Sequence, residues 1–170
     1  MKLKSISESE FQQLDGSRQV IADEHPRRFA ALDLDDIQRI YGFAWNSELI
    51  EPEIALSADG QIAWVGVDQY LTAIEIATGR IHIALKLHTN LLQILAMERI
   101  TAILAETEIL LFNSDFSIFL TKSFPDITEK ISIEGDKLKI CFLEGNSLML
   151  SLSTGSITNS SGLQATVKSA

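Results

Sequence analysis

From about residue 54 onward, hydrophobic positions recur along the chain at an interval of 38 residues. Ile62, Ile100 and Leu138 mark one series, and the positions around them keep their apolar or polar character from copy to copy. Further series in the same register are Val65, Ile103 and Cys141, then Ile74, Phe112 and Leu150, then Ile81, Phe119 and Ile157. The pattern predicts a structural unit that is repeated three times without a gap.

Each unit holds four short apolar runs of strand length, separated by turn residues such as Ala58-Asp59-Gly60 and Thr78-Gly79. The predicted strands are 54–56, 62–67, 70–76 and 81–87 in the first unit, 91–97, 100–105, 109–112 and 116–124 in the second, and 127–133, 137–142, 147–152 and 156–158 in the third. Helices are not expected in this part of the chain.

Residues 137–142 alternate between the two faces of a strand. The apolar set is Leu138, Ile140 and Phe142, and the opposite set is Lys137, Lys139 and Cys141. This alternation predicts a sheet with one dry face and one partly wet face. As the only cysteine, Cys141 forms no disulfide within the chain, and its apolar strand suggests a buried small hydrophobic residue.

A unit of about 40 residues with four short strands is typical of a β-propeller blade. The segment Tyr70–Ile81 resembles the third and fourth strands of quinoprotein-type and WD40-like blades, and the turn Ser57–Gly60 is similar to theirs. The resemblance covers about residues 54–157 and implies the fold alone. His82 and Ile83 stand where quinoprotein blades often carry a tryptophan, so no quinone or other cofactor is expected.

Residues 1–53 lie outside the repeat and are predicted to form a helical cap. Ser7 and Glu10 have the spacing of a capping box, and Gly16 would end that first helix. A second helix is predicted from Asp33 or Asp35 through Tyr41, with Gly42 as its stop. The aromatic-rich segment 43–50 that follows is expected to be core or edge cover.

The predicted fold is therefore all-β with a small α-helical N-terminal cap and three four-stranded antiparallel blades, which together make half a β-propeller. The domain boundaries place a cap at 1–53 and blades at 54–91, 92–129 and 130–170 within one domain. Three blades do not close a ring, so their open edges invite a cover or a partner.

Composition fits one compact domain, with 46% hydrophobic residues and a mean hydropathy of +0.15. The N-terminal residues lack an apolar stretch of signal-peptide length, and no apolar run reaches the length of a membrane span. The sequence therefore predicts a cytoplasmic protein without a membrane partner.

The net charge is −9, and residues 1–53 contribute 6 basic and 11 acidic side chains to it. No basic stripe is present, so binding to nucleic acid is not expected. An acidic surface favours a basic protein partner through complementary charge. The alternative interpretation is that the charge serves ordinary solubility.

Motifs for catalysis and metal binding are absent from the sequence. His25, His82 and His88 have no cysteine or carboxylate at metal-ligand spacing, and no nucleophile elbow or phosphate-binding loop occurs. Neighbouring acids such as Asp35 and Asp36 are usually solvated charges. We therefore expect no enzyme activity, no catalytic residues and no metal site.

The favoured hypothesis is a binding protein, in its sharpest form an immunity protein or antitoxin that neutralises a basic toxin, which could be a nuclease. The candidate partner-binding residues are Asp23, Glu24, Asp33, Asp35 and Asp36 in the N-terminal segment, and Glu106 and Glu108 in the second blade. The alternative is a structural module, two copies of which pair through blade edges into a closed six-bladed ring.

Overall fold

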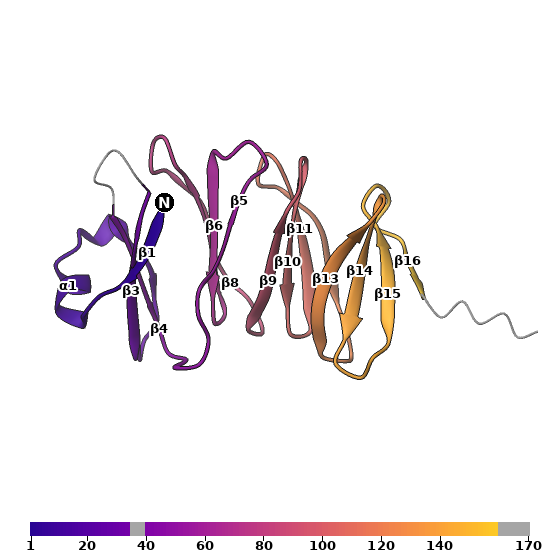
Figure 1. Cartoon of the computed structure of the whole chain (residues 1–170), viewed down its shortest axis with the longest axis horizontal. Coiled ribbons are helices and arrows are strands. Elements are labelled where there is room, and N and C mark those ends of the chain that lie inside the picture. Colours follow the sequence, from indigo (N-terminus) through magenta and orange to yellow (C-terminus); the bar gives the residue numbers. More distant parts are fainter. Residues whose placement is uncertain (35–39, 160–170) are drawn as a thin grey trace, which may run out of the picture.

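The computed structural model describes residues 1–34 and 40–159 and arranges their strands in four sheets of four strands each. The sheets stand in a row, each facing the next, and follow one another in chain order (Figure 1). We number them sheets 1 to 4 from the N-terminal side.

Sheets 2 to 4 are antiparallel meanders whose strands pair in chain order. Sheet 2 contains β5 (Glu53–Leu56), β6 (Ile62–Val67), β7 (Tyr70–Glu75) and β8 (Ile81–Lys86). Sheet 3 contains β9 (Leu91–Ala96), β10 (Ile100–Ala105), β11 (Glu108–Asn113) and β12 (Ile118–Ser123). Sheet 4 contains β13 (Thr128–Glu134), β14 (Lys137–Phe142), β15 (Ser147–Ser151) and β16 (Ile157–Asn159). The three repeated units are confirmed as four-stranded sheets, which begin at residues 53, 91 and 128.

The N-terminal segment forms a fourth sheet, so the prediction of a helical cap and of three blades is wrong for residues 1–53. Sheet 1 has the strand order β1 (Lys2–Ser5), β3 (Arg28–Asp33), β4 (Ile40–Trp45) and β2 (Gln19–Ala22), with β2 parallel to β4. Besides strands, the described residues of this segment form the five-residue helix α1 (Glu8–Gln12) and the 3-10 turn η1 (Gly16–Arg18).

The capping box is confirmed: Ser7 Oγ accepts the Glu10 N–H, and the Glu10 carboxylate accepts the Ser7 N–H at 2.7 Å. The hydrogen bonds from Ser7 lower the pKa of Glu10. The second predicted helix is wrong at its alternative start, Asp33, which ends β3, and at Ile40, Tyr41 and Gly42, which lie in β4. Its residues 35–39 lie outside the described residues. The physical reason is that Tyr41 starts a two-residue alternation of large aromatic side chains, which is a strand period.

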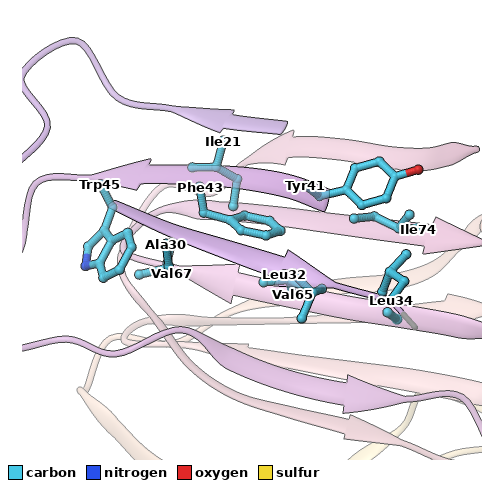
Figure 2. Packing of buried hydrophobic residues seen from close by; sticks show 11 residues of the cluster. Ile21, Ala30, Leu32, Leu34, Tyr41, Phe43, Trp45, Val65, Val67 and Ile74 are labelled. Carbon is cyan, nitrogen blue, oxygen red and sulfur yellow. The ribbon is translucent and has the colours of Figure 1, made fainter. Parts of the chain in front are cut away.

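Three apolar layers hold the row together, one between each pair of sheets. The first joins Tyr41, Phe43 and Trp45 of β4 to Val65 and other residues of sheet 2 (Figure 2). The second has Trp64 and Phe112 in ring contact, with centroids 5.3 Å apart, and the third packs sheet 3 against sheet 4. The predicted core role of segment 43–50 is thus confirmed for residues 43–45, but it is wrong for Leu49, which is 94% exposed.

The outer face of sheet 1 is covered by α1. The ring of Phe11 lies 5.6 Å from that of Phe29, and a Cβ at Gly42 would meet Leu14 and Phe11 side-chain atoms within 3 Å. The lack of a side chain at Gly42 therefore permits the close approach of α1 to β4. This glycine lies within the strand and does not end a helix.

The outer face of sheet 4 is polar. Leu138, Ile140 and Phe142 are buried against sheet 3, as their alternation predicts, whereas Lys139 and Cys141 are only half-buried on the opposite face. Cys141 is therefore not the fully buried residue that its strand suggested. The outer face of sheet 1 is thus covered and the outer face of sheet 4 is polar, so the two terminal sheets resemble the capping units of repeat proteins.

Gly66 tests the packing between sheets 2 and 3. A Cβ at this position would lie 2.3 Å from Leu91 Cδ1 and 3.2 Å from its Cγ, so Gly66→Ala is expected to lower the free energy of unfolding by about 1–3 kcal/mol through overpacking. Gly16→Ala is the matched control, because its Cβ meets nothing within 4 Å. Urea unfolding followed by circular dichroism measures both. An unchanged midpoint for Gly66→Ala would contradict this packing.

Candidate binding surface at the acidic end

One long side of the row, where the strands of all four sheets end, collects the connections between sheets together with the middle hairpin turn of each repeat. The connections are residues 23–27, 46–52, 68–69, 87–90, 106–107, 124–127 and 143–146, and we call them the acidic end. The strand registers bring them together, because β5 starts, β6 turns into β7, and β8 ends on the same side of sheet 2.

Acidic residues dominate these connections, all of which lie in the described part of the chain. They carry Asp23, Glu24, Glu48, Glu51, Asp68, Glu106, Asp126 and Glu144. Their only lysine or arginine is Arg27, which pairs with Glu48 at 3.2 Å. Such an excess of one sign produces a local negative potential that attracts cations and basic surfaces.

The turns at the opposite end, within the described residues 57–61, 76–80, 97–99, 114–117, 135–136 and 152–156, are closer to balance. They carry Asp59, Glu98, Asp115 and Asp136 against Arg80 and Arg99. Hydrogen bonds from Ser117 lower the pKa of Asp115, and those from Ser57 and the Gln61 N–H lower the pKa of Asp59. These two carboxylates support their own turns when ionised, and that support is lost as the pH falls through their lowered pKa values.

Backbone hydrogen bonds tie the acidic end into one framework that crosses all the repeats. The bonds run from the N–H of Leu87 to Gln69 O, Leu91 to Asp68 O, Glu106 to Asn90 O, Phe124 to Thr107 O, Thr128 to Glu106 O and Leu143 to Ile127 O. The buried Thr128 hydroxyl adds a bond to Ala105 O at 2.7 Å. Because the turns are fixed to one another in this way, the charges at this end hold their relative positions.

Asp68 is the most constrained acid of this surface. It has a positive φ of 49° in the two-residue turn between β6 and β7, a conformation that aspartate tolerates better than most residues. Its Oδ2 accepts the backbone N–H groups of Asn46 and Ser47, both at 3.0 Å, and so anchors the link from sheet 1 to sheet 2. Its Oδ1 is buried and has no hydrogen-bond partner among the described residues.

A cavity of about 370 Å³ opens beside Asp68, where sheets 1 and 2 meet at the acidic end. Its lining consists of Asp23, Asn46, Ser47, Ile50, Asp68, Gln69, Tyr70 and Asn90. The Tyr70 hydroxyl donates to Asp23 Oδ2 at 3.1 Å, and Lys86 Nζ lies 5.3 Å from the centre of the Tyr70 ring. The cavity is thus rich in hydrogen-bond acceptors.

Three of the residues proposed from the sequence lie together at the acidic end. Asp23 and Glu24 belong to connection 23–27, and Glu106 belongs to the β10–β11 turn, where its carboxylate accepts from Asn90 Nδ2 at 3.2 Å. Since Asn90 and Asp23 line the same cavity, the fold joins two sets that are far apart in sequence.

Two further proposed residues, Asp33 and Glu108, do not join this surface. Asp33 ends β3, at the far end of that strand, and Asp35 and Asp36 lie outside the described residues. Glu108 is only 4% exposed: it accepts the His88 N–H at 3.1 Å and lies 3.3 Å from the His88 ring nitrogen Nδ1. The carboxylate of Glu108, a candidate partner-binding residue from the sequence, is thus buried and holds connection 87–90.

Sequence reasoning missed Asp68, Tyr70, Asn46 and Asn90. The available signal was weak: Asp68-Gln69 reads as an ordinary hairpin turn, and nothing in the sequence indicates that connection 46–52 folds onto it.

The described residues contain neither a metal-ligand cluster nor a membrane-spanning helix. No group of three or more His, Cys, Asp or Glu side chains in residues 1–34 and 40–159 is placed to hold a metal ion. In the same residues, no helix has the length and apolar character needed to cross a membrane.

Comparison with known proteins bears on the fold. No protein-family model and no curated protein matches the chain. Among solved structures, it is similar to the WD40 domain of Neurospora crassa Pan2 (TM-score 0.53, 11% identity, covering 63% of this chain and 36% of that one). The chain is built from β-propeller blades. Its four-stranded sheets and its similarity to solved WD40 and propeller structures show this fold.

Two further solved structures are similar to the chain at equally low sequence identity. Kuenenia stuttgartiensis hydrazine synthase has a TM-score of 0.55 at 10% identity, over 66% of this chain and 36% of that one. The dihydro-heme d1 dehydrogenase NirN in complex with DHE has a TM-score of 0.55 at 10% identity, over 76% of this chain and 32% of that one. The chain spans about a third of the length of these structures, and at such identities the likeness shows the fold alone.

Removing the Asp68 carboxylate tests its anchoring role. Asp68→Gly keeps the positive φ without strain, so its effect reports the lost hydrogen bonds, and it is expected to lower the free energy of unfolding by about 1–3 kcal/mol. Asp68→Asn, which retains one acceptor oxygen, should lose less. Glu144→Gln, at an exposed acid, is the control for charge alone. Thermal and urea unfolding measure the series, and equal stability of Asp68→Gly and wild type would refute the anchor.

Proposed function

We propose that this protein is a non-enzymatic binding module whose acidic end receives a basic protein partner. The observation that supports the proposal most strongly is the charge of the connections at that end, with eight acids and one arginine. Complementary charge of this kind speeds encounter and selects partners.

In its sharpest form, the proposal is that the chain acts as an immunity protein or antitoxin that neutralises a basic toxin, such as a nuclease. A neutralising protein needs no chemistry of its own. It needs a rigid surface of opposite charge, since a preorganised surface avoids the entropic cost of ordering its loops on binding. The network of hydrogen bonds between the turns provides that rigidity at the acidic end.

The alternative, closure of a ring by two copies, has less support from the ends of the row. Closure needs an apolar face on each terminal sheet, because neighbouring blades pack through apolar layers. The outer face of sheet 1 is occupied by α1, and that of sheet 4 carries Lys139 and Cys141. Displacing α1 would expose Phe11, which is 6% exposed.

The proposal predicts capture of a basic protein whose binding depends on the acidic end. Tagged full-length chain is used to capture partners from its native cell lysate at low and at high salt, with identification by mass spectrometry. A basic protein released by salt is expected. Its purified form should lose its toxic or nuclease activity when mixed with one equivalent of this chain.

Charge reversal identifies the surface. The double variant Glu24→Lys/Glu144→Lys is expected to weaken partner binding at low salt by about ten-fold or more, mainly through slower association. Glu98→Lys/Asp136→Lys is the matched control, since it changes the net charge equally at exposed positions of the opposite end. Equal loss in both doubles, or recovery of this chain alone, would refute binding through the acidic end; the second result would favour self-pairing.

A further inference from the structure

The lining of the cavity includes Asp68, one of whose carboxylate oxygens is buried and has no donor among the described residues. Asp68 is 8% exposed, and while Oδ2 takes two backbone N–H groups, Oδ1 has no hydrogen-bond partner in the described part of the chain. A buried carboxylate oxygen without a donor is costly, because the charge has lost water and gained nothing in exchange. A donor that reached Oδ1 from the cavity side would remove this cost.

The lining supplies further acceptors, beside the amide and hydroxyl groups of Asn46, Gln69 and Ser47, which can also donate. Asp23 adds a second carboxylate, and Asn90 donates its Nδ2 to Glu106, which leaves its amide oxygen to accept. Tyr70 donates its hydroxyl proton to Asp23, so that its oxygen too is left as an acceptor. The two carboxylates and the further acceptors of the lining therefore favour a positively charged group with several N–H donors.

The chain does not supply that group from its own basic residues. The cavity lining, which lies entirely within the described residues, contains two carboxylates and no lysine or arginine. The nearby basic residues contact other groups: Arg27 pairs with Glu48, and Arg28 pairs with Glu51 and lies 5.2 Å from the centre of a Trp45 ring. Lys86 Nζ lies 5.3 Å from the centre of the Tyr70 ring, but Lys86 is not part of the lining.

We propose that this cavity is a binding site for a guanidinium group, namely an arginine side chain of the basic partner. A guanidinium carries five N–H donors in a planar fork and no acceptor, which matches several oxygens spread around one cavity better than an ammonium does. Its plane also stacks on aromatic rings, and Tyr70 offers such a ring beside both carboxylates. Ile50 in the lining suits the aliphatic stem of arginine.

The inference deepens the proposed function and rests on it for the identity of the ligand as a partner's arginine. The site itself is testable without a partner. N-acetyl-arginine amide, which carries one guanidinium and no ammonium, is titrated into the 15N-labelled full chain, and the amide shifts are followed by NMR. Because the Asn46 and Ser47 N–H groups donate to Asp68, their signals report directly on its carboxylate.

The expected result is a saturable shift of these two signals with a dissociation constant of about 1 mM, a reasonable affinity for a ligand of this size. Asp68→Asn should abolish saturation, and Asp23→Asn should weaken binding about five-fold or more. Asp136→Asn, at an exposed acid of the opposite end, is the control and should bind as wild type does. If Asp68→Asn does not fold, Asp23→Asn carries the test, because asparagine still accepts from the Tyr70 hydroxyl.

Three outcomes would overturn the site: no saturable shift in wild type, the same shift with potassium chloride at equal ionic strength, or unchanged binding in both cavity variants. An equal response to N-acetyl-lysine amide would overturn the assignment to guanidinium. The two proposals fail separately. A captured partner whose affinity is unaffected by Asp23→Asn refutes the cavity alone, whereas probe binding without any captured partner refutes the proposed function alone.

Discussion

The structure depends on the packing of sheet faces against one another along the row. A sheet inside the row must be apolar on both faces, whereas a terminal sheet needs only one such face. Sheet 2 meets this demand with Val65 and Val67 toward sheet 1, and with Trp64 toward sheet 3, while Gly66 leaves room for Leu91. This stacking determines which turns of different sheets lie near one another, and therefore where the charges of those turns gather.

The same constraint explains why the repeats could be read from the sequence. Strands of the inner sheets appear as unbroken apolar runs such as 62–67 and 100–105, and 137–142 alternates because it lies in the last sheet. The N-terminal sheet was missed because its pairing does not follow chain order: β2 precedes β3 in the chain yet lies beyond β4. Such non-local pairing leaves no periodic trace. The aromatic alternation from Tyr41 to Trp45 is a usable signal of a strand, but the prediction divides it, with Tyr41 in a helix and residues 43–45 in the segment after it.

The acidic end was predictable in part. Asp23, Glu24 and Glu106 stood out as acids near turns, but their convergence depends on how sheets 1, 2 and 3 stack. Asp68 could not be identified, since its importance comes from the N–H groups of Asn46 and Ser47, more than twenty residues away in the sequence. Glu108 also lies in a hairpin, but its carboxylate is buried and accepts the His88 N–H, so it is not a free surface charge. Local patterns thus locate charges, and tertiary contacts decide which charges are free to act.

The central claim is that the acidic end is the surface that meets the partner. Hydrogen exchange measured by mass spectrometry on the chain alone and in its partner complex tests that claim most directly. The account predicts slower exchange in the complex at connections 46–52, 68–69 and 87–90, with unchanged exchange in the turns at 97–99 and 135–136. Protection confined to those opposite turns, or to the outer strands β8 and β12, would contradict it.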